Sequence, residues 1–288
     1  MPLAPLNNQV VFKKLFQDPE IIIAFVKDLI GIELTPTTIE VEKQFTPPIG
    51  AVDFQIDVFV EDPLHRFVLE IQRVRYDYHY DRFLYYHYAA TLEMVKSHMF
   101  YKLERTVYTI VWLTSRTTDP LSQFAVITNT WHSVTDCGKT LAIYPHKIYF
   151  LNPHYVNEAT PSGVADWMQL MQASMSEAPQ PAVASERAVI QKAALLIDDD
   201  GLTPQERVRA IEQNEYEAHL RLQHTKGVAE GKKEGLLEGE KKGLLEGEKK
   251  GLLEGKRETA RKLLAKGFPP AEVADLTGLS KDDLPALP

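Results

Sequence analysis

Apolar residues recur at helical spacing in the segment that follows Asp18. Pro19 stands at the first helical position, where its missing N–H is no loss, and Gly31 supplies a stop. Between them runs an apolar stripe that consists of Ile21, Ile22, Phe25, Val26, Leu29 and Ile30. The pattern predicts a helix that begins at Pro19 and ends before Gly31.

Strand patterns dominate the next part of the chain. Three segments have the composition and alternation of β-strands, namely residues 39–45, 52–60 and 66–74. The turn sequence Glu61-Asp62-Pro63-Leu64-His65 joins the second segment to the third. These two segments are therefore expected to form a hairpin.

A second helix and two further strands are predicted beyond the hairpin. Residues 78–102 contain neither Gly nor Pro and place apolar side chains at helical spacing, namely Phe83, Leu84, Tyr88, Leu92 and Val95. Residues 108–114 resemble a buried strand, and residues 141–151 a weaker one that Pro145 interrupts. This order of elements indicates an α/β or α+β domain over residues 1–176.

The remainder of the chain predicts helical appendages. Residues 177–226 begin as a linker rich in Pro, Ala and Ser and continue as a polar helical arm without a core. In residues 227–258 Gly occupies every fourth position from Gly227 to Gly255, and the octad Gly-Leu-Leu-Glu-Gly-Glu-Lys-Lys is repeated. Residues 259–288 show a helix-turn-helix pattern that is too short for a full three-helix core.

The glycine repeat is a weak helix by itself. Each glycine costs about 0.8–1 kcal/mol relative to alanine, whereas an ion pair such as Glu238 with Lys242 contributes only a few tenths of a kcal/mol. We therefore expect the repeat to fray in isolation and to become helical when a partner packs against it. Self-association through the C-terminal helical region, giving a homo-oligomer, is the expected consequence.

Composition limits the classes of function. The 288 residues are 44% hydrophobic and carry a formal net charge of −8, which argues against a wholly basic nucleic-acid coat protein. Cys137 is the only cysteine, which excludes an intrachain disulfide and cysteine-rich zinc folds. The chain starts without a signal-like apolar segment, and its apolar runs are too short to span a membrane, so a cytoplasmic location is expected.

Chemistry concentrates in the predicted hairpin. If Asp62 and His65 close its turn, Asp57 lies opposite Glu70 on one face, where Gln55 and Gln72 also lie. The other face of this half-buried hairpin is apolar and carries Phe54, Ile56, Val58, Val60, Phe67, Leu69 and Ile71.

Two opposed carboxylates destabilise a hairpin unless a cation lies between them. Mg²⁺ suits such a pair because it prefers oxygen ligands, and Mn²⁺ or Ca²⁺ are alternatives. A bound metal of this kind can activate water and stabilise the charge that develops in phosphodiester cleavage. The alternative is a pair of acids that water solvates on an exposed sheet face.

Several motifs support a resemblance to a nuclease family. They lie between residues 8 and 115 and comprise Phe12-Lys-Lys-Leu-Phe16, Asp57-Val58, Glu70-Ile71-Gln72, Arg82-Phe-Leu-Tyr85-Tyr86 and Tyr101-Lys-Leu-Glu-Arg-Thr-Val-Tyr108-Thr-Ile110. Together with the order of elements, they resemble the Rpn (recombination-promoting nuclease) and transposase-like branch of the PD-(D/E)XK nuclease superfamily. The resemblance implies a restriction-endonuclease-like α/β core with the order αβββαβ.

The resemblance also implies a function. The chain would be a Mg²⁺-dependent DNA endonuclease, a hydrolase linked to recombination or mobile elements, with Asp57 and Glu70 as metal ligands. Gln72 would align the attacking water at the place where the wider superfamily usually has lysine. A glutamine can orient water or phosphate by hydrogen bonds, but it cannot offer the charge of an ammonium group.

Further residues are candidates for the same site. Glu20 could supply an additional acid, although an acid near a helix N-terminus is also favourable for the helix alone. Basic residues in and beside the hairpin alternate with tyrosines and comprise Arg66, Arg73, Arg75, Arg82, Lys96, Lys102 and Arg105. Among them Arg73 and Arg82 are the predicted DNA-phosphate contacts.

Two other functions stay open from the sequence. One is a catalytically silent protein that binds DNA through the nuclease-like core. The other is an oligomeric scaffold whose C-terminal helices assemble with partners.

Overall fold

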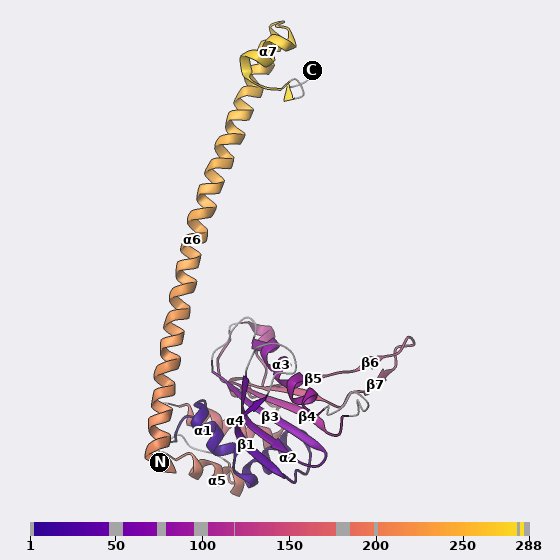
Figure 1. Cartoon of the computed structure of the whole chain (residues 1–288), viewed down its shortest axis with the longest axis vertical. Coiled ribbons are helices and arrows are strands. Elements are labelled where there is room, and N and C mark those ends of the chain that lie inside the picture. Colours follow the sequence, from indigo (N-terminus) through magenta and orange to yellow (C-terminus); the bar gives the residue numbers. More distant parts are fainter. Residues whose placement is uncertain are drawn as a thin grey trace. The chain divides into compact units, whose positions relative to one another are not determined.

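The computed structural model describes residues 3–45, 54–73, 79–94, 103–117, 119–176, 185–198, 201–280 and 283–284. The chain divides into two compact units, Met1–Glu215 and Tyr216–Pro288 (Figure 1). The first unit is a mixed α/β fold around a six-stranded sheet, as the sequence predicts. Among the described helices, none combines the length with the apolar content that crossing a bilayer would require.

The sheet has the strand order β1-β2-β3-β4-β8-β5. Neighbours among β1, β2 and β3 run antiparallel, β3, β4 and β8 run parallel to one another, and β5 is antiparallel to β8. These strands are β1 (Thr38–Phe45), β2 (Phe54–Glu61), β3 (His65–Gln72), β4 (Thr106–Leu113), β8 (Lys147–Leu151) and β5 (Val126–Thr130). A small hairpin of β6 (Ser133–Val134) and β7 (Thr140–Leu141) extends away from the sheet (Figure 1).

Helices cover both faces of the sheet. One face packs against α1 (Gln9–Phe16), α2 (Pro19–Ile30), α4 (Ser162–Ser174) and α5 (Ala188–Leu196) in a core that includes Trp112. The other face packs against α3 (His79–Leu92), with Phe83 fully buried. Two short 3-10 helices, η1 (Pro120–Ser122) and η2 (Pro153–Tyr155), lie in the connections.

The helix predicted from Pro19 to the residue before Gly31 is confirmed, and so are both of its ends. Asp18 is the N-cap of α2, and its carboxylate accepts the backbone N–H groups of Glu20 and Ile21. Gly31 ends the helix with a φ of 80°, a left-handed conformation that glycine adopts without steric cost. Local sequence signals therefore define this element completely.

Two other predicted elements differ from the structure. The second long helix was expected to reach residue 102, but α3 ends at Leu92, and residues 95–102 lie outside the described part of the chain. The last strand was expected over residues 141–151, but β8 begins only at Lys147. Pro145 explains this late start, because proline cannot donate to a strand ladder.

The expected polar arm is partly core. Ile190, Ala193 and Ile197, at or just beyond α5, are fully buried in the first unit. Their spacing puts them on one helical face, which packs in the cluster that contains α1, α2 and α4. The first unit thus extends to Glu215 rather than ending at residue 176, and the expected linker at 177–184 lies outside the described residues.

The second unit consists of two helices. The long helix α6 (Pro204–Ala265) begins in the first unit and continues into this one, and α7 (Pro270–Thr277) follows a turn at Gly267. A small apolar cluster joins the end of α6 to α7 and contains Ala260, Leu264, Val273 and Leu279. This is the helix-turn-helix pattern of the sequence, closed by a core of only a few side chains.

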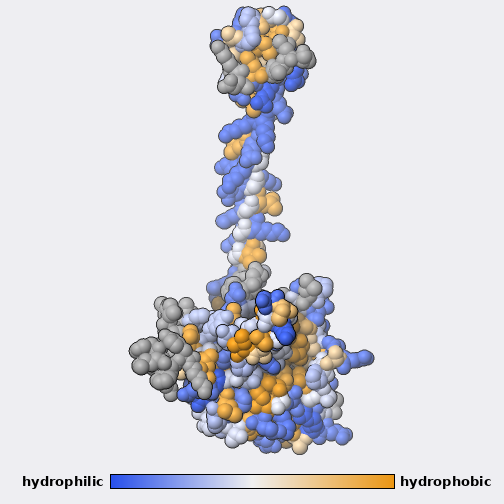
Figure 2. All heavy atoms as spheres, turned by 90° about the vertical axis from the view of Figure 1, so that its right-hand side faces the viewer, coloured by the Kyte–Doolittle hydropathy of each residue, from blue (hydrophilic) through white to orange (hydrophobic). Residues whose placement is uncertain are grey.

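The glycine repeat is helical along its whole length. A Cβ atom at any glycine from Gly227 to Gly255 would meet nothing within 4 Å. Figure 2 shows this part of α6 as mostly hydrophilic with isolated apolar patches, and Leu236, Leu244 and Leu252 are each more than half exposed. The expected fraying concerns the free energy of this helix in solution and stays a prediction.

Candidate active site

The β2–β3 hairpin places the two predicted acids side by side. Its register pairs Val58 with Leu69 and Glu61 with Arg66, which is the predicted register. At the next position, side chains connect the strands: the Asp57 N–H donates to Glu70 Oε1 at 3.0 Å, and the Ile71 N–H donates to Asp57 Oδ2 at 3.0 Å. Each carboxylate therefore reaches across to the other strand, and the two share one location.

Both carboxylates are buried, which the sequence did not predict. Asp57 is 5% exposed and Glu70 is 1% exposed, so the expected half-buried hairpin is wrong, and so is the alternative of two acids that water solvates on an exposed sheet face. The physical reason is α3, which packs on the face that also carries Phe59 and Val68. The pair therefore lies in a medium that disfavours charge.

The alternation of strand β2 is interrupted at Asp57. Ile56 packs with Phe59 on the α3 side of the sheet, whereas Val58 and Val60 pack on the other side. Level with Asp57 on β1, Glu42 has a φ of 58°, the only non-glycine residue with positive φ in the described part of the chain. The prediction that Ile56 shares a face with Val58 is thus wrong, because both strands are distorted at this point.

Two cationic side chains approach the pair from opposite faces of the sheet. Lys13 on α1 places Nζ 3.4 Å from Asp57 Oδ1 and 3.1 Å from Glu42 Oε1. Arg82 on α3 places Nη2 4.0 Å from Glu70 Oε2. One oxygen of each carboxylate thus accepts a backbone N–H, while the other faces a cation.

Gln72 joins the same constellation. Its Oε1 accepts from Arg82 Nη1 at 3.2 Å, and Arg82 Nε donates to the Tyr86 hydroxyl at 2.6 Å. Gln72 lies on β3 two residues after Glu70 and is also buried. The structure therefore brings together Asp57, Glu70, Gln72 and Arg82, as the sequence predicts.

The neighbouring cations offset the burial of the acids only in part. Burial raises the pKa of Asp57 above its ordinary value, although Lys13 and the Ile71 N–H act in the opposite direction. Burial raises the pKa of Glu70 well above its ordinary value, and the adjacent Asp57 charge raises it further. Lys13 and Arg82 therefore do not fully compensate the free-energy cost of burying two negative charges at this site.

The structure does not bring Glu20, the candidate additional acid, to this pair. The Glu20 carboxylate lies 2.7 Å from Lys192 Nζ, and α2 packs on the face opposite α3. Among the described residues, no three His, Cys, Asp or Glu side chains come close enough to hold a metal ion together. A metal here would have to rely on the two carboxylates, other oxygen donors and water.

The predicted phosphate contacts lie in different surroundings. Arg82 adjoins the carboxylate pair, and its side chain is 42% exposed. Arg73 follows Gln72 on the chain and donates to Asn214 Oδ1 on α6 at 2.8 Å. Contact of either residue with DNA stays a prediction.

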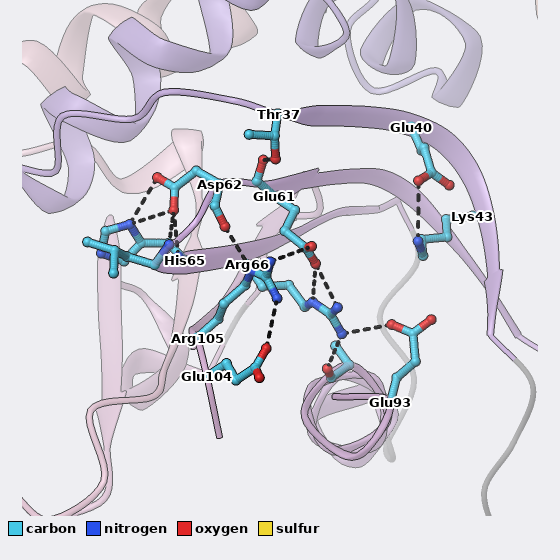
Figure 3. Close-up of polar contacts among 12 residues, drawn as sticks. Thr37, Glu40, Lys43, Glu61, Asp62, His65, Arg66, Glu93, Glu104 and Arg105 are labelled. Atoms are coloured by element: carbon cyan, nitrogen blue, oxygen red, sulfur yellow. Dashed lines mark hydrogen bonds and ion pairs between the residues drawn. The ribbon is translucent and has the colours of Figure 1, made fainter. Parts of the chain in front are cut away.

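A second polar cluster lies at the turn end of the hairpin (Figure 3). Arg66 donates to the carboxylates of Glu61 and Glu93 and to the Ala90 carbonyl, while Arg105 pairs with Glu61 at 3.3 Å. A polar cavity of about 290 Å³ lies beside these groups. Acidic partners hold both guanidinium groups, so any contact of Arg66 or Arg105 with DNA phosphate stays a prediction.

Sequence reasoning missed Lys13 and Glu42 as members of the site. Lys13 belongs to the motif Phe12-Lys-Lys-Leu-Phe16, where buried side chains flank it. A lysine beside buried residues of a helix indicates that an acidic side chain lies nearby, because its buried charge needs a counter-ion. The sequence around Glu42 does not indicate that this residue belongs to the site, because its contact with Lys13 involves a distorted backbone in β1.

No family model matches the chain, and neither does any curated protein or solved structure.

Proposed function

We propose that the chain is a cytoplasmic, metal-dependent DNA endonuclease with the restriction-endonuclease-like core of the Rpn and transposase-like branch, acting in recombination or on mobile elements. The observation that carries this proposal is the buried pair of Asp57 and Glu70, which the hairpin holds together despite the cost of burying like charges. A fold does not retain such a pair for stability alone. Buried acids with raised pKa values typically mark functional sites.

The donor set fits Mg²⁺. Each carboxylate has one oxygen that faces only a cationic side chain, and an incoming divalent ion can replace that cation. A bound divalent ion would supply positive charge for the attacked phosphate and lower the pKa of water. Asp57 and Glu70 would hold the ion, with Mn²⁺ or Ca²⁺ as substitutes.

The other side chains of the site have distinct roles in hydrolysis. The Gln72 amide orients the attacking water by hydrogen bonding, and the Arg82 guanidinium pairs with a phosphate oxygen. The oxygen of water bonds to phosphorus as one phosphorus–oxygen ester bond breaks. The leaving oxygen receives a proton, so one water molecule is consumed for each bond cleaved.

The C-terminal unit supports a role in self-association or DNA capture. The glycine stripe of α6 leaves room for close approach of another helix, and the exposed leucines of the repeat offer apolar surface. We propose that a homo-oligomer forms through this region.

A catalytically silent DNA-binding protein is the alternative function. Lys13 and Arg82 already face the outer carboxylate oxygens, and among the described residues no three His, Cys, Asp or Glu side chains come close enough to hold a metal ion together. A site balanced in this way could retain DNA binding without cleavage.

A plasmid-nicking assay separates the two proposals. The full-length wild type is compared with Asp57→Asn, Glu70→Gln and the control Glu20→Gln in Mg²⁺, Mn²⁺ and Ca²⁺. The nuclease proposal predicts metal-dependent nicking by the wild type and the control, and at least about 100-fold slower nicking by the two site variants. Equal nicking by all four proteins would eliminate this site, and no nicking in any metal would favour the silent protein.

A further inference from the structure

We infer that Lys13 has two successive roles at this site. Before a divalent cation binds, the Lys13 ammonium group compensates the negative charge of Asp57. Once a divalent cation binds Asp57 instead, the ammonium group contacts the attacked phosphate. The inference rests on the proposed nuclease function. It assigns a catalytic role to a residue on α1, far in sequence from the hairpin. Its basis is the contact of the Lys13 ammonium with Asp57 and Glu42.

The helix that carries Lys13 is firmly anchored. Phe12, Leu15 and Phe16 are fully buried in the first core, which fixes the side of α1 that faces the sheet. The Lys13 side chain is only 14% exposed, although a lysine on a short amphipathic helix usually reaches water. The adjacent Lys14 makes a different contact, with Glu206 at 2.8 Å.

The strand opposite α1 is shaped to receive the ammonium group. Glu42 has a positive φ of 58°, a backbone conformation that costs free energy for any residue except glycine. In this conformation its carboxylate is 3.1 Å from Lys13 Nζ. Strain of this kind at a charged contact points to a functional reason for holding Lys13 in place.

Lys13 can give up its contact with Asp57 and take another partner. The Lys13 ammonium lies 3.4 Å from Asp57 Oδ1 and closer, at 3.1 Å, to Glu42 Oε1, to which it donates a hydrogen bond. If Asp57 held a divalent ion, the Lys13 ammonium would be repelled from it, and the flexible stem of lysine would let the group turn without movement of α1. The ammonium then lies within reach of a phosphate that approaches the same carboxylate.

The negative charge that develops on the attacked phosphate is best stabilised by a cationic hydrogen-bond donor. Gln72 is uncharged, and Arg82, the proposed partner of one phosphate oxygen, is held in place by its hydrogen bonds with Gln72 and Tyr86. Among the described residues, Lys13 is the second cationic side chain at the pair, and its contacts with Asp57 and Glu42 can be exchanged. Its three N–H donors can stabilise the extra negative charge of the transition state.

The test measures metal affinity and cleavage separately in the full-length chain. Lys13→Met, Lys13→Arg and the matched control Lys14→Met are compared with the wild type, by Mn²⁺ calorimetry and by plasmid-nicking kinetics. Loss of the competing ammonium predicts Mn²⁺ binding about tenfold tighter in Lys13→Met. Its kcat should fall about 100-fold with KM nearly unchanged, Lys13→Arg should recover part of the rate, and Lys14→Met should match the wild type.

Each outcome decides the inference independently of the nuclease proposal. Unchanged or weaker Mn²⁺ affinity in Lys13→Met overturns the role of Lys13 as the balancing cation, even when no protein cleaves DNA and the nuclease proposal itself has failed. Tighter Mn²⁺ binding with an unchanged kcat overturns the phosphate contact while the nuclease proposal stands. Should Lys13→Met fail to fold, Glu42→Ala serves instead: it removes the hydrogen-bond acceptor of the ammonium group, and a kcat equal to that of the wild type overturns the inference.

Discussion

Replacing Glu70 by glutamine should stabilise the first unit while it abolishes activity. The side-chain carbonyl of glutamine can still accept the Asp57 N–H, so the substitution removes a buried charge and keeps the hydrogen bond. Two unit charges about 5 Å apart repel by about 3 kcal/mol at an effective dielectric constant of 20. Arg82 beside Glu70 and Lys13 beside Asp57 offset part of this repulsion. The expected gain in unfolding free energy is about 1–3 kcal/mol at pH 7.5 without divalent ions.

Tryptophan fluorescence measures this gain in the full-length protein. All three tryptophans, Trp112, Trp131 and Trp167, belong to the first unit, so the signal follows that unit alone. A unit of this size gains about 2–4 °C in Tm per kcal/mol, so a gain of about 1–3 kcal/mol predicts a rise of roughly 2–12 °C. The control Glu20→Gln alters an exposed ion pair and should stay within about 0.5 kcal/mol of the wild type.

The pH dependence follows from the raised pKa of Glu70. Because folding raises this pKa, the protonated carboxyl favours the folded state, and the wild type loses this stabilisation as the pH rises above the ordinary Glu value of 4.5. The advantage of Glu70→Gln should therefore be small near pH 4 and grow toward neutral pH. A variant that is less stable than the wild type at pH 7.5, without divalent ions, would refute the reasoning, since it would show that Lys13 and Arg82 already balance the pair.

Three further perturbations test other parts of the account. Arg66→Ala should destabilise the first unit by about 1–3 kcal/mol in urea unfolding, because it removes the buried guanidinium group that binds Glu61, Glu93 and the Ala90 carbonyl; a loss below about 0.5 kcal/mol would contradict this role. Ile190→Ala should cost about 2–4 kcal/mol in the same assay, whereas a polar arm would tolerate it. A chain that ends at Glu215 should keep metal-dependent nicking but lose self-association in light scattering; a scaffold would lose every function.

Local signals explain the part of the fold that the sequence predicted. Pro19 and Gly31 delimit α2, and the turn at Asp62–His65 sets the hairpin register because it determines every pairing that follows. Once the register is known, Asp57 must lie beside Glu70. These inferences needed no knowledge of distant contacts.

The remaining features depend on contacts between distant segments. The burial of Glu70 depends on α3, and the burial of Ile190 depends on helices more than 150 residues earlier in the chain. Glu20 was a reasonable candidate by residue type, but α2 lies on the opposite face of the sheet. Lys13 reaches Asp57 only because β1 is distorted at Glu42, which no local pattern predicts.

Diffraction from crystals grown in Mn²⁺ tests the central claim most directly. Data collected at the manganese absorption edge locate the ion by its anomalous scattering, whether or not the protein turns over. The account predicts one strong peak at the Asp57 and Glu70 carboxylates, with Lys13 Nζ moved away from Asp57. Full Mn²⁺ occupancy elsewhere, with Lys13 still on Asp57 and no peak at the pair, would contradict it.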